Sequence, residues 1–288
     1  MTAEIFDRGY RRYDGERTGV PGAMRTLIKH SVRRSLGLGR SARFKIIPVA
    51  IILFSFVPAI VFVGLAALLP DELGDEFLPT YAEYYGFIVT TLYLFAAFVA
   101  PDLLCTDRRT SMLGVYLASP LDRRTYLTSK AIAVAIMLGI VTIGPPLFLM
   151  IALWLEGSGP SGLTEFLQDG GQIIASGIMM SAVYTAVSFA VSASTDRSGP
   201  AVASTLGLLV GSSIIASILA ETTDVSANIR LLNLLTLPLE LAFRIHGEAG
   251  ATEWRSISTT NMWLAVLGIV IVSAVWVWSR YGPLLVRR

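Results

Sequence analysis

The chain has 288 residues, of which 53% are hydrophobic and 15% are charged, with a formal net charge of +2 and a mean hydropathy of +0.63. This composition is too apolar for an ordinary water-soluble domain and predicts a protein that crosses a membrane several times. A single cysteine, Cys105, excludes an intrachain disulfide, and with only two histidines we predict no Cys/His metal site. We expect Cys105 to be a small buried or interfacial thiol.

Residues 1–47 are predicted to form a cytoplasmic tail followed by a helix at the membrane surface. The first 21 residues are polar, basic and rich in glycine, and they show no periodic pattern. From Met24 to Leu36, apolar residues recur on one side of a helix and basic residues on the other. Such a helix suits the interface of an anionic inner leaflet, and packing against the protein is the alternative. We expect no cleaved signal peptide, because the segment before the first apolar run is long and polar.

Six long apolar runs follow this N-terminal region, each of about twenty residues or more. At about 1.5 Å rise per residue, a helix of this length crosses the roughly 30 Å hydrocarbon core of a bilayer. The predicted spans are residues 48–69, 84–104, 130–155, 172–194, 200–220 and 260–281. We expect the prolines Pro58, Pro145 and Pro146 to bend the spans that contain them.

The distribution of Lys and Arg between the spans predicts the orientation of the chain. Twenty of these residues fall in the tails and in the loops after spans two and four, and three fall in the loops on the other side. Basic residues concentrate on the cytoplasmic side of membrane proteins. Both termini and the loop between spans two and three are therefore predicted to be cytoplasmic.

The polar, basic stretch of residues 105–130 links spans two and three. Its first half contains an apolar stripe from Met112 to Leu117, whereas Asp107, Arg108 and Arg109 are assigned to the polar side of the helix or to its lead-in. We expect this half to lie along the membrane surface.

A second helix is predicted to begin at Pro120, with Ser119 as its cap and Asp122 closing a box-like Ser-x-x-Asp pattern. Arg123 and Arg124 in the first turn oppose the helix dipole. Their presence in the first turn is therefore better explained by their location in the protein, or by contact with a partner, than by a contribution to helix stability. An ordinary basic loop on the cytoplasmic side of the membrane is the alternative.

The turn Leu-Ala-Ser-Pro-Leu-x-Arg-Arg, followed by a helix with a lysine ten residues beyond the proline, resembles the intracellular loop between spans two and three of type-2 ATP-binding-cassette (ABC) permeases. The matching residues are Leu117, Ala118, Ser119, Pro120, Leu121, Arg123, Arg124 and Lys130. In that family the loop carries a coupling helix that docks on a separate cytoplasmic ATPase subunit, and an interfacial helix commonly precedes span one. The loop here lacks a glutamate that is often found early in the family's version.

The resemblance implies a set of residues that couple the membrane domain to the ATPase. They are Asp107, Arg108, Arg109, Leu117, Ser119, Pro120, Leu121, Asp122, Arg123 and Arg124.

The fifth span carries small residues at every fourth position, Ala203, Gly207 and Gly211. This spacing permits close approach of two helices in lipid. The stripe is predicted to pack either within the chain or, as span five does in the family, near the interface of a dimer.

Residues 221–259 form the longest outer segment, and its apolar part, residues 229–245, contains Pro238 and three charged residues. A seventh span there would place the basic C-terminal tail outside, against the charge distribution. We therefore predict short re-entrant or interfacial helices, as found between spans five and six of type-2 ABC permeases. The Gly-rich segment from Gln168 to Gln172 is predicted to be an outer loop.

Some kinds of chemistry are absent from the sequence. No Gly-x-x-x-x-Gly-Lys-Ser/Thr loop occurs, so we predict no catalytic residue and no cofactor in this chain, with ATP and Mg bound by the partner ATPase. The ionisable residues Glu83, Asp102, Lys130 and Glu156 lie at or near the ends of predicted spans. An ion-coupled carrier usually places such a group at membrane depth, which makes that class the weaker alternative.

The sequence is thus interpreted as an all-α polytopic membrane protein with six transmembrane helices, an N-terminal interfacial helix and a cytoplasmic coupling helix. The predicted divisions are residues 1–47, the transmembrane domain of residues 48–281, and a basic tail of residues 282–288. The resemblance implies the permease subunit of an ABC exporter in the inner or plasma membrane, acting as a dimer with ATPase subunits and without nucleic acid. A sensory or docking membrane protein is the main alternative. Drugs, lipids and lipid-linked glycans fit the apolar interior equally well as substrates.

Overall fold

The computed structural model describes residues 18–39, 43–68, 77–222 and 226–282, and these residues fold into helices joined by short connections, with no strand among them. Residues 1–17 of the tail predicted over residues 1–21, and the last six residues of the predicted C-terminal tail, lie outside the described residues, whereas residues 19–21 already belong to a helix. The prediction of an all-α membrane protein is confirmed, because six of the helices are long and apolar enough to cross a bilayer.

The six spanning helices fall where the apolar runs predict them. They are α2 (Arg43–Ala66), α4 (Tyr81–Arg109), α6 (Arg123–Glu156), α7 (Leu163–Ser192), α8 (Ser198–Thr222) and α10 (Thr259–Tyr281). Several begin or end beyond the apolar run, because their capping residues lie in the polar segments. At the start of α4, for example, Thr80 accepts a hydrogen bond from the Glu83 backbone while the Glu83 carboxylate accepts one from the Thr80 backbone.

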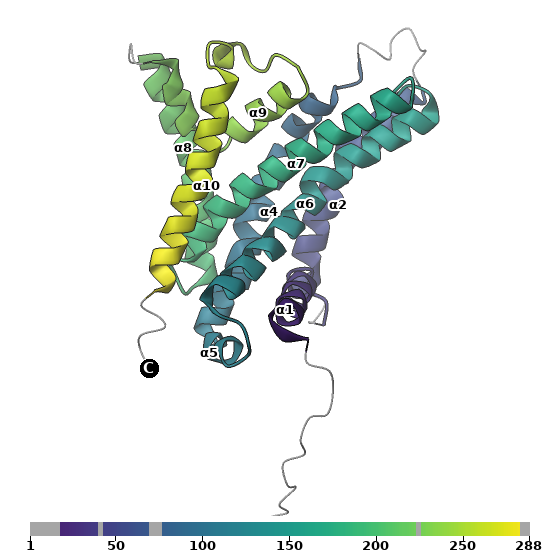
Figure 1. Cartoon of the computed structure of the whole chain (residues 1–288). Coiled ribbons are helices and arrows are strands. Elements are labelled where there is room, and N and C mark those ends of the chain that lie inside the picture. The colour runs from purple at the N-terminus through teal and green to yellow at the C-terminus, as the bar shows by residue number, and fades with distance from the viewer. Residues whose placement is uncertain (1–17, 40–42, 69–76, 223–225, 283–288) are drawn as a thin grey trace, which may run out of the picture.

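Three of the spans form the centre of the bundle and three lie around it (Figure 1). Helices α4, α6 and α7 are the most buried, and they pack against one another. Helices α2, α8 and α10 pack on this centre, are much less buried, and expose many large apolar side chains. An apolar exposed surface is what a bundle surrounded by lipid requires.

Helices α6 and α7 form the closest pairing in the centre of the bundle. The Thr142 hydroxyl of α6 donates a 2.9 Å hydrogen bond to the carbonyl of Gly177 in α7 and lies 2.8 Å from the Ser181 hydroxyl. A Cβ atom added to Gly177 would lie only 2.3 Å from a side-chain carbon of Ile143. Glycine at this position therefore allows the two backbones to approach.

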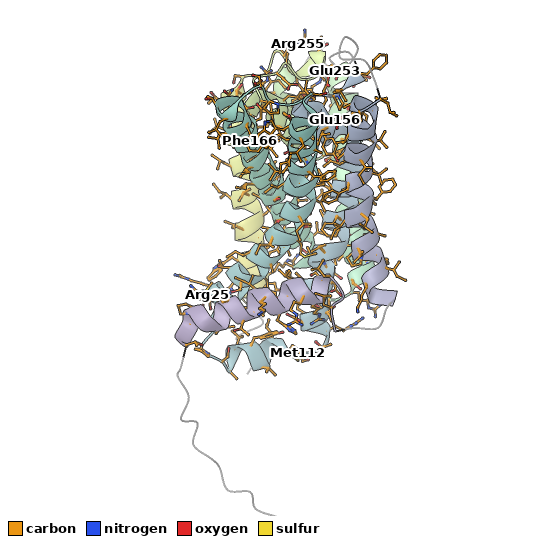
Figure 2. All side chains as sticks on the ribbon, turned by 90° about the vertical axis from the view of Figure 1, so that its right-hand side faces the viewer. Arg25, Met112, Glu156, Phe166, Glu253 and Arg255 are labelled. Atoms are coloured by element: carbon orange, nitrogen blue, oxygen red, sulfur yellow. The ribbon has the colours of Figure 1, made fainter. Side chains whose placement is uncertain are left out.

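One end of the bundle carries two helices that do not span it, α1 (Gly19–Ser35) and α5 (Leu113–Leu117). Figure 2 shows α1 lying across the ends of the spans, with Arg25 and Met112 at this end of the molecule and Arg255 at the other. The predicted N-terminal helix is confirmed. Its apolar face packs on the protein, mainly on α6, with Leu27 buried. Whether α1 also contacts lipid stays a prediction.

The opposite end is covered by short helices between α8 and α10: η1 (Ala227–Leu232), α9 (Leu237–Ile245) and η2 (Thr252–Trp254). The buried Glu240 carboxylate of α9 accepts a hydrogen bond from the Ala251 backbone at 3.1 Å, and its burial raises the pKa of that carboxyl group. A Cβ atom at Gly250 would collide with this carboxylate. The predicted short helices are present here, and their re-entrant position stays a prediction.

The prediction of a loop from Gln168 to Gln172 is wrong, because these residues lie inside α7. Helix α6 ends at Glu156 with Gly157 in a left-handed conformation, and α7 begins at Leu163. The connection is therefore complete before the Gly-Gly pair is reached. Gly170 is buried beside Met150 of α6, and this packing offsets part of the low helix propensity of the pair.

Candidate coupling surface

The candidate coupling surface is formed by residues 107–124, where α4 ends, α5 projects and α6 begins. Helix α4 stops at a tight turn in which Ser111 has a positive φ of 55°. The Met112 backbone donates to the Asp107 carbonyl at 3.0 Å, and the Ser111 backbone donates to the Arg108 carbonyl at 3.2 Å. These two bonds form a Schellman motif, which usually has glycine at the left-handed position. The turn reverses the chain directly after the span.

Helix α5 is only five residues long, and it is attached to the bundle mainly through aromatic contacts. The Tyr116 ring lies 5.7 Å from the Tyr126 ring of α6, and the Tyr126 ring lies 6.4 Å from the Tyr281 ring of α10. Burial raises the pKa of the Tyr116 hydroxyl above its ordinary value. The row of tyrosines connects α5 with two different spans.

Helix α6 begins at Arg123, and its cap is Asp122 rather than Ser119. The Asp122 carboxylate accepts the Thr125 backbone hydrogen bond at 2.8 Å, and the Thr125 hydroxyl accepts one from the Asp122 backbone at 2.8 Å. The bond from the Thr125 backbone and a second one from the Thr125 hydroxyl to the Asp122 carboxylate hold the pKa of Asp122 below its ordinary value. The predicted start at Pro120 is wrong, because the Asp122 box satisfies the first backbone groups of the helix. Pro120 lies in the preceding turn.

Asp107 is fully buried, which corrects its expected position on the polar side of the helix. Its carboxylate lies 3.2 Å from Nη1 of Arg34 in α1 and 2.6 Å from Nζ of Lys130 in α6. The Tyr126 hydroxyl donates a hydrogen bond of 3.1 Å to the same carboxylate. We call Asp107, Arg34, Lys130 and Tyr126 the Asp107 cluster. It joins α1 to the two spans that flank α5.

Arg108 also points inward, toward the connection between α7 and α8. It lies 2.8 Å from the Asp196 carboxylate, donates to the Ala193 carbonyl at 2.5 Å, and stacks 5.6 Å above the Tyr281 ring. The buried Cys105 thiol lies beside the same connection, 3.4 Å from the Thr195 carbonyl. The expectation of a buried or interfacial thiol is met. These contacts attach the C-terminal end of α4 to α10 and to the connection between α7 and α8.

The remaining predicted coupling residues divide by exposure. Those that the structure exposes are Arg109, Ser119, Pro120, Asp122 and Arg124; Leu117 and Arg123 are half-buried, and Leu121 is buried. Val115 was not among the predicted coupling residues, although 63% of it is exposed at the tip of α5. Leu113 packs on the core, and Val115 lies on the opposite side of this five-residue helix. This spacing is the sequence signal that could have identified Val115 as exposed.

Arg123 and Arg124 lie on the flank of the surface rather than at its tip. The Arg123 guanidinium stacks 3.7 Å above the Trp278 ring of α10, and that of Arg124 lies 5.7 Å from the same ring. Both arginines thus face a spanning helix at the end of the molecule that carries α5. Within the described part of the chain, no group of three or more acidic, His or Cys side chains could hold a metal ion.

A family model described as "ABC-2 family transporter protein" matches residues 74–277, more than two thirds of the chain. The chain belongs to this family. The matched region of the ABC-2 chain begins just before α4 and includes the whole coupling surface and nearly all of α10. A comparison with curated proteins found no match. The ABC-2 chain is therefore the multi-pass membrane subunit of an ABC transporter, a type of subunit that works with a partner ATP-binding-cassette subunit.

Proposed function

We propose that this ABC-2 chain is the permease of an exporter in the inner or plasma membrane, with both termini cytoplasmic. A separate ATPase subunit binds ATP and Mg, and it docks on the tip of α5 around Val115. The observation that supports this proposal is the attachment of α5. The Schellman turn at Ser111 connects it to the end of α4, the Tyr116–Tyr126 ring contact connects it to α6, and the Asp107 cluster joins both spans to α1.

Closure of the ATPase pair on ATP would push on α5 and tilt α4 and α6 together, since only short turns separate them from α5. Helices that are rigidly connected transmit such a displacement as a unit. The substrate would leave through a path between two copies of the chain. Export is the direction expected from the family resemblance.

The proposed dimer uses the small-residue stripe of α8. Ala203 and Gly207 are exposed, and a Cβ atom added to Gly207 or Gly211 would meet nothing within 4 Å among the described residues. The stripe is thus unoccupied by this chain's own side chains over those glycines. A second copy, or a related permease, packed there would bring two helix backbones close together.

The test is co-purification of the chain with its ATPase subunit in lipid, with measurement of complex mass and ATP hydrolysis. Val115→Asp should weaken the complex by about tenfold or more, because a carboxylate replaces an apolar contact at the centre of the interface. The mass of the wild-type complex should correspond to two permease chains and two ATPase subunits.

Leu232→Asp is the matched control, because Leu232 is 59% exposed at the opposite end of the molecule. It should leave complex formation unchanged. A chain that binds no ATPase and shows no dependence on ATP would contradict the proposal and favour the sensory alternative. Arg123 and Arg124 are less suitable for this test, since their substitution also removes contacts with Trp278.

A further inference from the structure

An apolar groove of about 710 Å³ opens on the side of the bundle between α6, α7 and α10. Helices α6 and α10 both pack on α7, which forms the floor of the groove. The space between the helices exists because several of the lining side chains are small. These are Ala131, Ala135, Ala182 and Ala274. The volume lies within the roughly 300–1,000 Å³ range of small-molecule sites.

The groove spans about one leaflet of a bilayer. Along α6 its lining runs from Arg124 to Ala135, which at about 1.5 Å rise per residue is about 16 Å. The hydrocarbon core is roughly 30 Å thick, so the groove covers about half of it. It begins at the end of the molecule that carries α5, with Trp278 at its mouth.

The mouth of the groove presents cationic hydrogen-bond donors. Arg124 lines it, and Arg123 stacks on Trp278 beside it. The Nε and Nη2 atoms of Arg123 are buried and donate to no group among the described residues. The adjacent carboxylate, Asp122, accepts hydrogen bonds from Thr125 instead. The mouth thus matches an anion, and guanidinium groups suit phosphate oxygens in particular.

A second polar group lies deeper in the groove. Thr185 of α7 is 6% exposed and lines the groove, and its hydroxyl has no hydrogen-bond partner among the described residues. It lies about 10 Å along α7 from the helix end at Ser192. Apart from Ser273 of α10, the lining farther from the mouth is aliphatic. The order of cation, hydroxyl and apolar wall matches the phosphate, ester and acyl chains of a phospholipid.

We propose that this groove binds an anionic phospholipid of the cytoplasmic leaflet. Arg123 and Arg124 hold the phosphate, Thr185 donates to an ester carbonyl, and one acyl chain lies along α7 between α6 and α10. The bound lipid fills the space between α10 and the start of α6, next to the coupling surface. Assignment to the cytoplasmic leaflet rests on the proposed orientation, whereas the match of groove to lipid does not.

The test is native mass spectrometry of the full chain, stripped of lipid and titrated with dioleoyl phosphatidylglycerol or dioleoyl phosphatidylcholine. The first bound phosphatidylglycerol should be preferred over phosphatidylcholine. Each arginine at a membrane surface contributes about fivefold to binding of an anionic lipid. Arg124→Gln should therefore reduce the preference by about fivefold, and Arg197→Gln, an exposed arginine at the same end outside the groove, should not.

Ala182→Leu fills the groove without touching a charge and should weaken binding of both lipids. Ala175→Leu, an exposed position on the same helix outside the groove, is its control. Equal affinity for the two lipids, or no effect of Ala182→Leu in a monodisperse protein, would overturn the proposal. Full competition by glycerol 3-phosphate would also overturn it, because the site would then recognise a free phosphate rather than a lipid. None of these readouts depends on an ATPase, so they are separate from the test of transport.

Discussion

The position of Asp107 shows how a single side chain organises the coupling end of this molecule. In the structure it lies on the same buried face of α4 as Leu103 and Leu104, although its neighbours Arg108 and Arg109 are polar. A buried carboxylate is costly unless cations compensate it. The compensation comes from α1, whose Arg34 is 73 residues away, and from α6, the next spanning helix in the chain.

Breaking the Asp107 cluster should be strongly destabilising. Asp107→Asn removes the anion and leaves Lys130, which is 1% exposed, as an uncompensated buried cation. We expect the free energy of unfolding to fall by roughly 3–5 kcal/mol. The measurement is denaturant unfolding of the detergent-solubilised chain. Adding Lys130→Met to this variant should recover part of the loss, because the uncompensated charge is then removed.

Asp196→Asn is the matched control for this prediction. Asp196 also pairs with an arginine, Arg108, but its side chain is 64% exposed. Solvent screens such a pair, so the expected loss is at most about 1 kcal/mol. Equal losses for the two aspartates would show that burial of Asp107 does not govern the stability of this end.

At the scale of helices, tertiary packing decides details that local signals leave ambiguous. Two start signals compete before α6, at Ser119 and at Asp122, and the structure uses the second. Here Thr125 completes a reciprocal capping box, whereas the Ser119 hydroxyl bonds to the Tyr116 carbonyl. Likewise, Gly170 and Gly171 stay helical because α7 continues beside α6.

The pairing of α6 with α7 should depend on Gly177. Gly177→Ala places a methyl group 2.3 Å from the nearest Ile143 atom and 3.1 Å from the Thr142 carbonyl. Because the helices must separate or Ile143 must leave its rotamer, we expect a loss of about 1–3 kcal/mol in unfolding free energy. Thermal unfolding of the purified chain measures it.

Gly171→Ala serves as the control on the same helix, since nothing lies within 4 Å of the added methyl group. It should be neutral or should stabilise the chain by up to about 1 kcal/mol through helix propensity. A loss at Gly177 no larger than that at Gly171 would mean that the close approach of α6 and α7 is not needed for stability.

At the scale of the whole molecule, one end is basic and carries α1 and α5, and the other carries the short helices η1, α9 and η2 (Figures 1 and 2). The distribution of Lys and Arg predicts that the first end is cytoplasmic. The coupling proposal and the leaflet assigned to the lipid groove both require this orientation.

Cysteine labelling tests the orientation directly, because the native Cys105 is buried. Arg255→Cys and Arg197→Cys replace exposed arginines at opposite ends of the molecule. A membrane-impermeant maleimide added to intact cells should label the first and not the second. After lysis both should react. Labelling of Arg197→Cys in intact cells would invert the orientation and exclude docking of a cytoplasmic ATPase on α5.

The sequence alone determined the number of spans and the existence of the N-terminal helix. These features depend on apolar length and periodicity, which are local properties of the chain. The residues Leu117 to Arg124, with Lys130, also identified the family by resemblance, and the family match supports it. Local capping chemistry, by contrast, left the start of α6 ambiguous.

Only the tertiary structure decided which charged residues face a partner and which face the interior. Asp107 and Arg108 are adjacent to Arg109 in a polar stretch, yet the first two are held by residues of distant helices while Arg109 is exposed. The groove between α6, α7 and α10 is likewise assembled from three separate spans. Such sites depend on how helices pack, and the energetics of burying or exposing a charge are set by neighbours that lie far apart in the sequence.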